Sequence, residues 1–187
     1  MHIQNELKSG GGVGSASKDD IDSSLERLNK LNESSKGYDP ADVKKELQEC
    51  MQNYFGVFRR GEFMKKGLDQ LNDLREKVGN LHLKDKSNAF NTSRVEAIEL
   101  QNLFEVAEAT AISAYYRTES RGAHARDDYP YRDDENWLCH TIYDPISKSV
   151  SKRQVNFNPA KVDAFPPKVR SYCCLATSCR SAYLDII

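Results

Sequence analysis

Apolar residues recur at helical spacing through the first two thirds of the chain. Apolar side chains three and four positions apart predict a helix with one buried face. Four such segments can be followed, and the short connections between them favour an antiparallel bundle of three to four helices. We place this bundle at residues 19–118. Its predicted core includes Leu25, Leu47, Met51, Leu71, Val95, Leu103 and Val106.

Polar residues with capping chemistry mark where these helices start. Ser17 or Asp19 suits the start of the first helix, because short polar side chains accept hydrogen bonds from the free N–H groups of a first turn. Asp39-Pro40 joins a cap to a first-turn proline at the start of the second. Ser93-Arg94-Val95-Glu96 has the spacing of a capping box, which predicts a long fourth helix from Ser93 to about Tyr116.

The pattern changes beyond Arg117. Gly122 and Pro130 interrupt any helix, and the stretch 137–143 is rich in strand-forming residues before a turn signal at Asp144-Pro145. The chain is therefore predicted to be mainly α, with a small irregular region and a β-hairpin after the bundle. We divide it into a flexible opening segment at 1–18, the bundle at 19–118, an irregular loop, hairpin and extended arm at 119–172, and a tail at 173–187.

Composition narrows the class of protein. The net charge of −1 gives no global field that would attract nucleic acid. No apolar run approaches the ~20 residues needed to span a bilayer, so direct membrane insertion is not expected. Five cysteines in no regular framework fit a reducing compartment. We therefore expect a cytoplasmic protein.

Charged residues crowd together between residues 117 and 135, where four arginines, one histidine and six carboxylates occur. Two interpretations are open. Arginines bind carboxylates in bidentate fashion and a histidine can move protons, so His124 with Arg121 and Arg126 could act on a carboxylate substrate. Alternatively, ion pairs order an irregular loop whose backbone groups need partners. The candidate residues of this structural or interface loop are Arg117, Glu119, Arg121, His124, Arg126, Asp127, Arg132, Asp133 and Asp134.

Specific stretches carry a family resemblance. They are LQECMQNYFGVFR (Leu47 to Arg59), FNTSRVEAIELQNLFEVAEATAISA (Phe90 to Ala114), RTESRGAHARDDYPYRDDENWLCH (Arg117 to His140) and AFPPKVRSY (Ala164 to Tyr172). With them the chain resembles the C-terminal portion of the flavoprotein subunit of the succinate dehydrogenase and fumarate reductase family. The resemblance implies a parent subunit that oxidises succinate to fumarate with covalently bound FAD. It further implies electron transfer to an iron–sulphur subunit and quinone, on membrane anchor subunits at the inner membrane face.

The resemblance also implies that the chemistry lies in the preceding part of such a subunit. No GxGxxG between a strand and a helix occurs in this sequence. We therefore expect no catalytic, cofactor-binding or metal-binding residues here, and no activity of the chain alone. The resemblance also implies that residues 1–18 are a flexible remnant of a missing N-terminal flavin domain, and the charged loop is interpreted as packing near that domain. Two alternatives stay open: a stand-alone helical module that binds respiratory-complex partners, and the same domain of a fumarate reductase.

The final stretch, Cys173 to Ile187, matches nothing in the family pattern. Cys173, Cys174 and Cys179 lack the paired spacing of a structural zinc site. A metal site completed by Cys139-His140 is the less favoured interpretation. We expect residues 173–187 to be dispensable for stability.

Overall fold

The computed structural model describes Lys8, residues 15–165, and residues 167 and 168. The long helices come first in the chain: α2 (Lys18–Glu33), α3 (Pro40–Phe55), α4 (Gly61–Gly79) and α5 (Thr92–Tyr116). Two very short strands, β1 (Phe58–Arg59) and β2 (Ala125–Arg126), pair in parallel. The short helix α6 (Asp134–Trp137) then leads into an antiparallel hairpin of β3 (Cys139–Asp144) and β4 (Ser149–Gln154).

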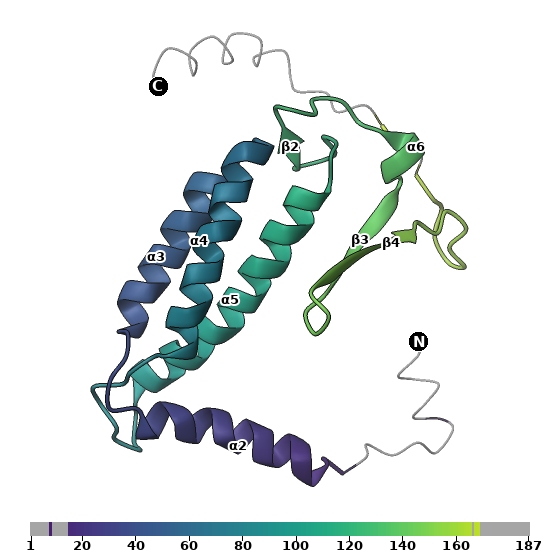
Figure 1. The fold of residues 1–187 in the computed structure, drawn as a ribbon. Coiled ribbons are helices and arrows are strands. Elements are labelled where there is room, and N and C mark those ends of the chain that lie inside the picture. Colours follow the sequence, from purple (N-terminus) through teal and green to yellow (C-terminus); the bar gives the residue numbers. More distant parts are fainter. Residues whose placement is uncertain (1–7, 9–14, 166, 169–187) are drawn as a thin grey trace.

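Helices α3, α4 and α5 lie side by side, with α4 antiparallel to the other two, as Figure 1 shows. Helix α2 crosses the end of this bundle at which α4 finishes, and its one buried residue is Leu31. The predicted bundle is confirmed as three helices with a fourth across one end. The predicted hairpin is confirmed as well, and it lies beside α5 at the other side of the bundle.

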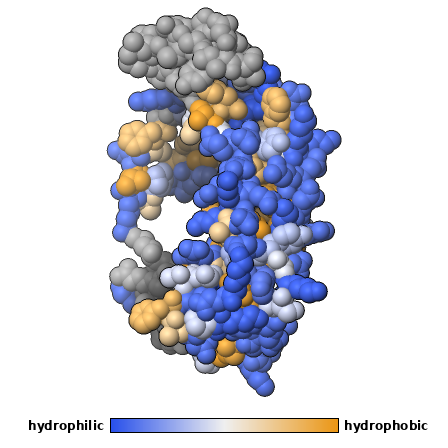
Figure 2. Space-filling model, turned by 90° about the vertical axis from the view of Figure 1, so that its left-hand side faces the viewer, coloured by the Kyte–Doolittle hydropathy of each residue, from blue (hydrophilic) through white to orange (hydrophobic). Residues whose placement is uncertain are grey.

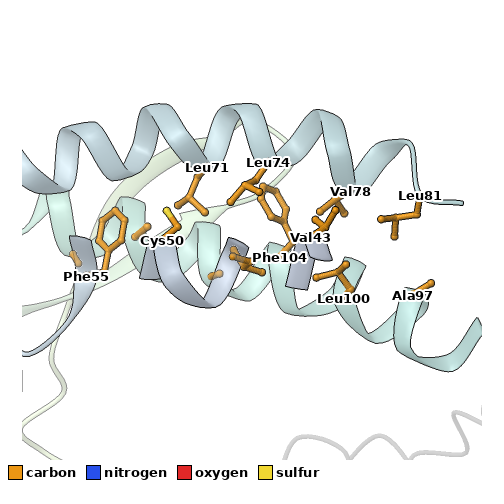
Figure 3. Close-up of a cluster of buried hydrophobic side chains, with 14 of the residues drawn as sticks. Val43, Cys50, Phe55, Leu71, Leu74, Val78, Leu81, Ala97, Leu100 and Phe104 are labelled. Atoms are coloured by element: carbon orange, nitrogen blue, oxygen red, sulfur yellow. The ribbon is translucent and has the colours of Figure 1, made fainter. Parts of the chain in front are cut away.

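The core fills the space between the three bundle helices (Figure 3). Gly67 marks the close approach of α4 to α3, since a Cβ built there would lie 2.5 Å from Tyr54 Cβ and from the Phe55 ring. The buried carboxylate of Glu108 in α5 forms an ion pair with Arg75 of α4. The large side chains with almost no exposed surface include Val43, Leu47, Cys50, Met64, Leu71, Leu74, Leu83 and Leu100.

The predicted core face needs correction on two helices. Leu47 and Leu71 are buried and Met51 is partly buried against the core, as expected. The structure instead leaves exposed Leu25 (50%), Val95 (54%), Leu103 (41%) and Val106 (64%). The buried face of α5 is made largely of alanines, at positions 97, 107, 111 and 114, with Leu100 and Phe104. The large apolar residues did not predict the buried face of α5, because this helix packs closely against its neighbours through small residues. Val106 lies about 120° around the helix axis from the buried Leu100.

The caps explain where the helices start. Ser17 Oγ accepts from the Asp20 N–H and Asp39 Oδ1 from the Ala41 N–H, which confirms both predicted caps. The predicted capping box at Ser93 is wrong. Asn91 caps α5 instead, because its Oδ1 accepts from the Arg94 N–H at 2.9 Å while its amide donates to carbonyls of the preceding loop.

The surface on the side of α3 is mostly hydrophilic, with scattered hydrophobic residues, in Figure 2. None of the described helices is both long enough and apolar enough to cross a bilayer.

Candidate functional site

The charged loop lies over one end of the bundle and connects α5 to α6 (Figure 1). It is anchored through the β1–β2 pairing, in which Phe58 lies opposite Ala125 and Arg59 opposite Arg126. The Asp127 N–H extends this pairing by donating to the Arg59 carbonyl at 2.9 Å. This pairing brings together residues that lie more than sixty positions apart in the sequence.

Arg126 is a buried cap for the C-terminus of α5. Its Nη1 donates to the carbonyls of Ala114, Tyr115 and Arg117 at 3.4, 3.1 and 3.2 Å. The last carbonyls of a helix have no partner within the helix, and the negative end of the helix dipole favours a cation there. The predicted loop residue Arg126 therefore stabilises a helix end.

Asp128 continues this chain of contacts to the next helix. Its carboxylate accepts from Arg126 Nε at 2.7 Å and Nη2 at 2.6 Å, and from the Gly61 N–H at the start of α4 at 2.9 Å. The Arg126 guanidinium lowers the pKa of Asp128 to about 2, with help from the Gly61 hydrogen bond and against the effect of burial. Because Arg60, the N-cap residue of α4, makes no side-chain cap, Asp128 supplies one from the loop.

Glu119 is the buried centre of the loop, with no exposed side-chain surface. Its oxygens accept from Arg117 Nη1, from Arg121 Nε at 2.7 Å and Nη2 at 3.0 Å, and from the Asp133 N–H at 2.8 Å. Burial by itself raises the pKa of Glu119, but the hydrogen bonds from Arg121, Asp133 and Arg117 outweigh it and the net shift is downward. Both carboxylate oxygens are committed to internal donors.

Arg117 joins the loop to the hairpin. Besides Glu119, it donates to the Trp137 carbonyl at 3.0 Å, to the Cys139 carbonyl, and to Thr141 Oγ1 at 3.3 and 3.2 Å. Its guanidinium lies over the ring of Trp137, which is buried.

His124 is held between two arginines. Its Nδ1 lies 2.8 Å from Arg59 Nη1 and its Nε2 lies 3.2 Å from the Arg117 carbonyl. A guanidinium can only donate, so Nδ1 accepts and Nε2 carries the proton. Burial lowers the pKa of His124, the carbonyl contact opposes this, and the charges of Arg59, Arg126 and Arg117 lower it further. His124 is thus a neutral link between β1 and the loop.

The remaining candidates lie at the loop's outer edge. Asp134 accepts from Arg121 Nη2 at 2.6 Å and from Arg132 Nε at 3.1 Å. Asp127 pairs with Arg60 at 3.4 Å, and Asp133 caps α6 by accepting from the Asn136 N–H at 3.0 Å. The expectation that Asp127 and Asp133 pair with arginines of the same loop is therefore wrong, since Asp127 pairs with Arg60 before α4 and Asp133 accepts from Asn136 of α6.

Sequence reasoning missed two residues that hold this arrangement. Asp128 was left out of the expected pairs, and Arg59 lies 65 positions before its partner His124. The one local signal is the short Arg59-Arg60-Gly61 break between two helices, which exposes backbone groups that need capping.

An open groove of about 910 Å³ runs between the outer side of α5 and the segment that forms α6 and the hairpin. One wall carries Val106, Ala109, Thr110 and Ser113 of α5 at helical spacing. The other carries Trp137, Leu138, Tyr143 and Val155, and the end near the loop is lined by Arg59, Arg117, Arg121 and His124.

Within the described residues, no cluster of three or more His, Cys, Asp or Glu side chains is placed to hold a metal ion. The alternative involving Cys173, Cys174 and Cys179 lies outside those residues. The ion pairs of the described arrangement fix the end of the bundle.

Comparison with known proteins places the chain in a family. The model described as "Fumarate reductase flavoprotein C-term" matches residues 44–172. The succinate dehydrogenase flavoprotein subunit of Coxiella burnetii is 44% identical over 170 residues, which cover 91% of this chain and 29% of that protein. The fumarate reductase flavoprotein subunit of Mycobacterium tuberculosis is 33% identical over 132 residues, covering 71% and 22%.

A solved structure agrees. The flavoprotein chain of E. coli quinol fumarate reductase superposes with a TM-score of 0.70 at 32% identity, covering 83% of this chain and 27% of that one. The chain thus spans under a third of the length of the proteins it matches. The predicted resemblance is confirmed: this chain belongs to the family of C-terminal domains of succinate dehydrogenase and fumarate reductase flavoprotein subunits.

Proposed function

We propose that this chain acts as the C-terminal helical domain of a succinate dehydrogenase flavoprotein subunit. In this proposal the subunit oxidises succinate to fumarate and passes electrons from FAD to an iron–sulphur subunit and quinone. Membrane anchor subunits hold the assembly, which places the flavoprotein at the cytoplasmic side of the inner membrane. The 44% identity to the Coxiella burnetii succinate dehydrogenase subunit supports this assignment, and the 33% identity to the M. tuberculosis fumarate reductase subunit supports the same domain of a fumarate reductase as the second candidate.

The role we assign to the charged loop is docking and support. This role is supported by the observation that the charged groups of the loop already pair with partners inside the chain. Glu119 accepts hydrogen bonds from Arg117, Arg121 and the Asp133 N–H. Both ring nitrogens of neutral His124 are hydrogen-bonded, one to Arg59 and the other to the Arg117 carbonyl. A general base must have a lone pair within reach of the proton it removes. The loop therefore shapes a surface for the flavin-binding portion, and proton transfer belongs elsewhere.

FAD does not fit the described residues. Their two sheets have two strands each, and neither begins a strand–turn–helix unit with the glycine-rich turn that holds a dinucleotide pyrophosphate. We therefore assign FAD, which supplies the hydride acceptor when bound, to the preceding portion of the complete subunit.

A chimera tests this function. The part of the C. burnetii subunit that matches this chain is replaced by the chain itself, so that a full-length protein is produced. We expect the chimera to hold FAD and reduce a dye with succinate, whereas the 187-residue chain alone does neither. Flavin absorbance or succinate-dependent dye reduction by the chain alone would contradict the proposal. Fumarate reduction faster than succinate oxidation would favour the fumarate reductase alternative.

Arg121 separates docking from catalysis in the same chimera. If the loop docks, Arg121→Ala lowers the thermal midpoint and flavin retention while molecules that keep FAD turn over at the normal rate. If Arg121 instead acts on substrate, the variant keeps FAD and loses its turnover number.

A further inference from the structure

Arg59 differs from every other arginine around the charged loop. Its Nε donates to the carbonyls of Phe55 and Gly56 at 3.2 and 3.1 Å, and its Nη1 to neutral His124 at 2.8 Å. Among the described residues, no carboxylate lies within ion-pair distance of it. The arginines that do have a carboxylate partner are Arg60, Arg117, Arg121, Arg126 and Arg132.

An unpaired, half-buried cation is unfavourable unless a partner reaches it. Desolvation lowers the pKa of Arg59, and the nearby charge of Arg126 lowers it further. A guanidinium carries five N–H donors in a planar fork that fits a carboxylate, and Arg59 uses only some of them. Because Arg59 lines the groove, a carboxylate lying in the groove can reach the free donors.

The groove walls also expose apolar surface. Val106 is 64% exposed on the α5 wall although it is a large apolar residue. On the opposite wall the Tyr143 hydroxyl is buried and has no hydrogen-bond partner in the part of the chain described. The groove therefore combines an exposed apolar residue, an unsatisfied hydroxyl and an unpaired cation.

We propose that the groove between α5 and the hairpin receives an acidic segment of the flavin-binding portion, with a carboxylate side chain paired to Arg59 and apolar side chains against Val106. This inference rests on the proposed function. The occupant comes from the rest of such a subunit, since this chain covers 29% of the length of the C. burnetii subunit.

A free dicarboxylate fits this groove less well. Small-molecule sites usually bury about 70–90% of the ligand, whereas Val106, Thr110, His140 and Pro145 leave the walls of this groove open. A dicarboxylate also needs cations at both ends, and Arg117 and Arg121 already pair with Glu119. A polypeptide segment covers the open walls with its own surface and needs only one cation.

Cysteine labelling tests the position of the occupant. Val106→Cys is introduced into the 187-residue chain and into the chimera, and its rate of reaction with a maleimide is measured in both. We expect protection of at least about tenfold in the chimera. The matched control is Lys45→Cys on the outer side of α3, where the side chain is 77% exposed and labelling should be equal in both proteins.

Charge variants test the ion pair. In the Val106→Cys chimera, Arg59→Glu should return labelling to within about threefold of the rate in the isolated chain, and Arg59→Lys should keep most of the protection. Since Arg59 also contacts His124, a second variant avoids that contact: Thr110→Glu, on the exposed groove wall, should repel the acidic segment without disturbing the fold. Circular dichroism of the isolated variants checks their helicity.

The possible failures can be told apart. An active, FAD-containing chimera in which Val106→Cys labels as fast as in the isolated chain would overturn the groove assignment and leave the proposed function standing. A chimera that neither holds FAD nor reduces dye would contradict both. Calorimetric binding of succinate to the isolated chain, abolished by Arg59→Ala, would overturn the polypeptide occupant in favour of a small carboxylate.

Discussion

The carboxylate of Asp128 receives hydrogen bonds from the first N–H of α4 and from Arg126, which itself caps the last carbonyls of α5. One acid–base pair therefore serves two helix ends of opposite polarity. Each end alone would leave backbone groups without partners at the top of the bundle. The pair also ties the loop to the ends of both helices.

The depressed pKa of Asp128 makes this contact dependent on pH. Its pKa falls from the usual 3.8 to about 2 in the folded chain. A depressed pKa stabilises the folded state fully above about pH 4, and that stabilisation is lost as the pH falls through about 2. The side chain is one third exposed, so we discount the linkage for solvent screening and expect on the order of 1–2 kcal/mol.

Asp128→Asn should therefore lower the free energy of unfolding by about 1–2 kcal/mol at pH 6, and by about half as much at pH 3, where the folded-state carboxylate is still mostly ionised. Urea denaturation followed by circular dichroism at pH 6, 4 and 3 measures the difference. Asp163→Asn, at an exposed position of the C-terminal arm, is the matched control and should be neutral throughout. An equal deficit at pH 6 and pH 3 would show that the carboxylate charge is not what matters.

At the residue scale, the sequence predicted which side chains gather but not how they pair. Glu119, Arg121 and Asp134 lie close together in the chain, and they do form one network. Arg59 escaped prediction because its contact with His124 depends on the β1–β2 pairing, and so does the contact of Asp128 with Gly61; both join residues more than sixty positions apart. Two paired residues per strand leave no periodic pattern that a sequence could reveal.

At the scale of elements, α5 shows why helix positions were easier to predict than buried faces. Its limits were placed within one residue, since the length of a helical pattern is a local feature, although its capping residue is Asn91 and not Ser93. Its buried face was not, because alanines and the ion-paired Glu108 face the neighbouring helices while valines face outward. An outward apolar stripe on a helix that already has a packed face is typical of a surface awaiting a partner.

Leu100 and Leu103 test this orientation with the same chemical change on one helix. Leu100 is 1% exposed and Leu103 is 41% exposed. Leu100→Ala should cost about 2–5 kcal/mol of unfolding free energy, because it removes buried methyl groups and leaves a cavity. Leu103→Ala should cost less than about 1 kcal/mol in the isolated chain. Urea denaturation of the two variants measures both, and a reversed order would mean that α5 is rotated about its axis.

At the scale of the whole molecule, the described chain consists of a bundle with a continuous apolar core and a hairpin region with little of its own. The core cluster belongs to α2–α5 and the connections between them, whereas Trp137 is the one buried hydrophobic residue between α6 and β4. The order of bundle and hairpin followed from composition and turn signals. The groove between them did not, since it depends on how far the hairpin lies from α5.

Unequal burial predicts unequal resistance to opening. Backbone hydrogen bonds in regions with few buried apolar contacts exchange through local openings that cost less than global unfolding. In the isolated chain, amides of β3 and β4 should therefore exchange markedly faster than those at the centres of α3, α4 and α5. Hydrogen exchange read by mass spectrometry measures this peptide by peptide. If the groove receives a segment of the flavin-binding portion, amides of β3 and β4 should exchange more slowly in the chimera than in the isolated chain. Exchange at the bundle centre should be nearly the same in both proteins. Equal protection of hairpin and bundle in the isolated chain would mean that the hairpin is held by more than the Arg117 contacts and Trp137.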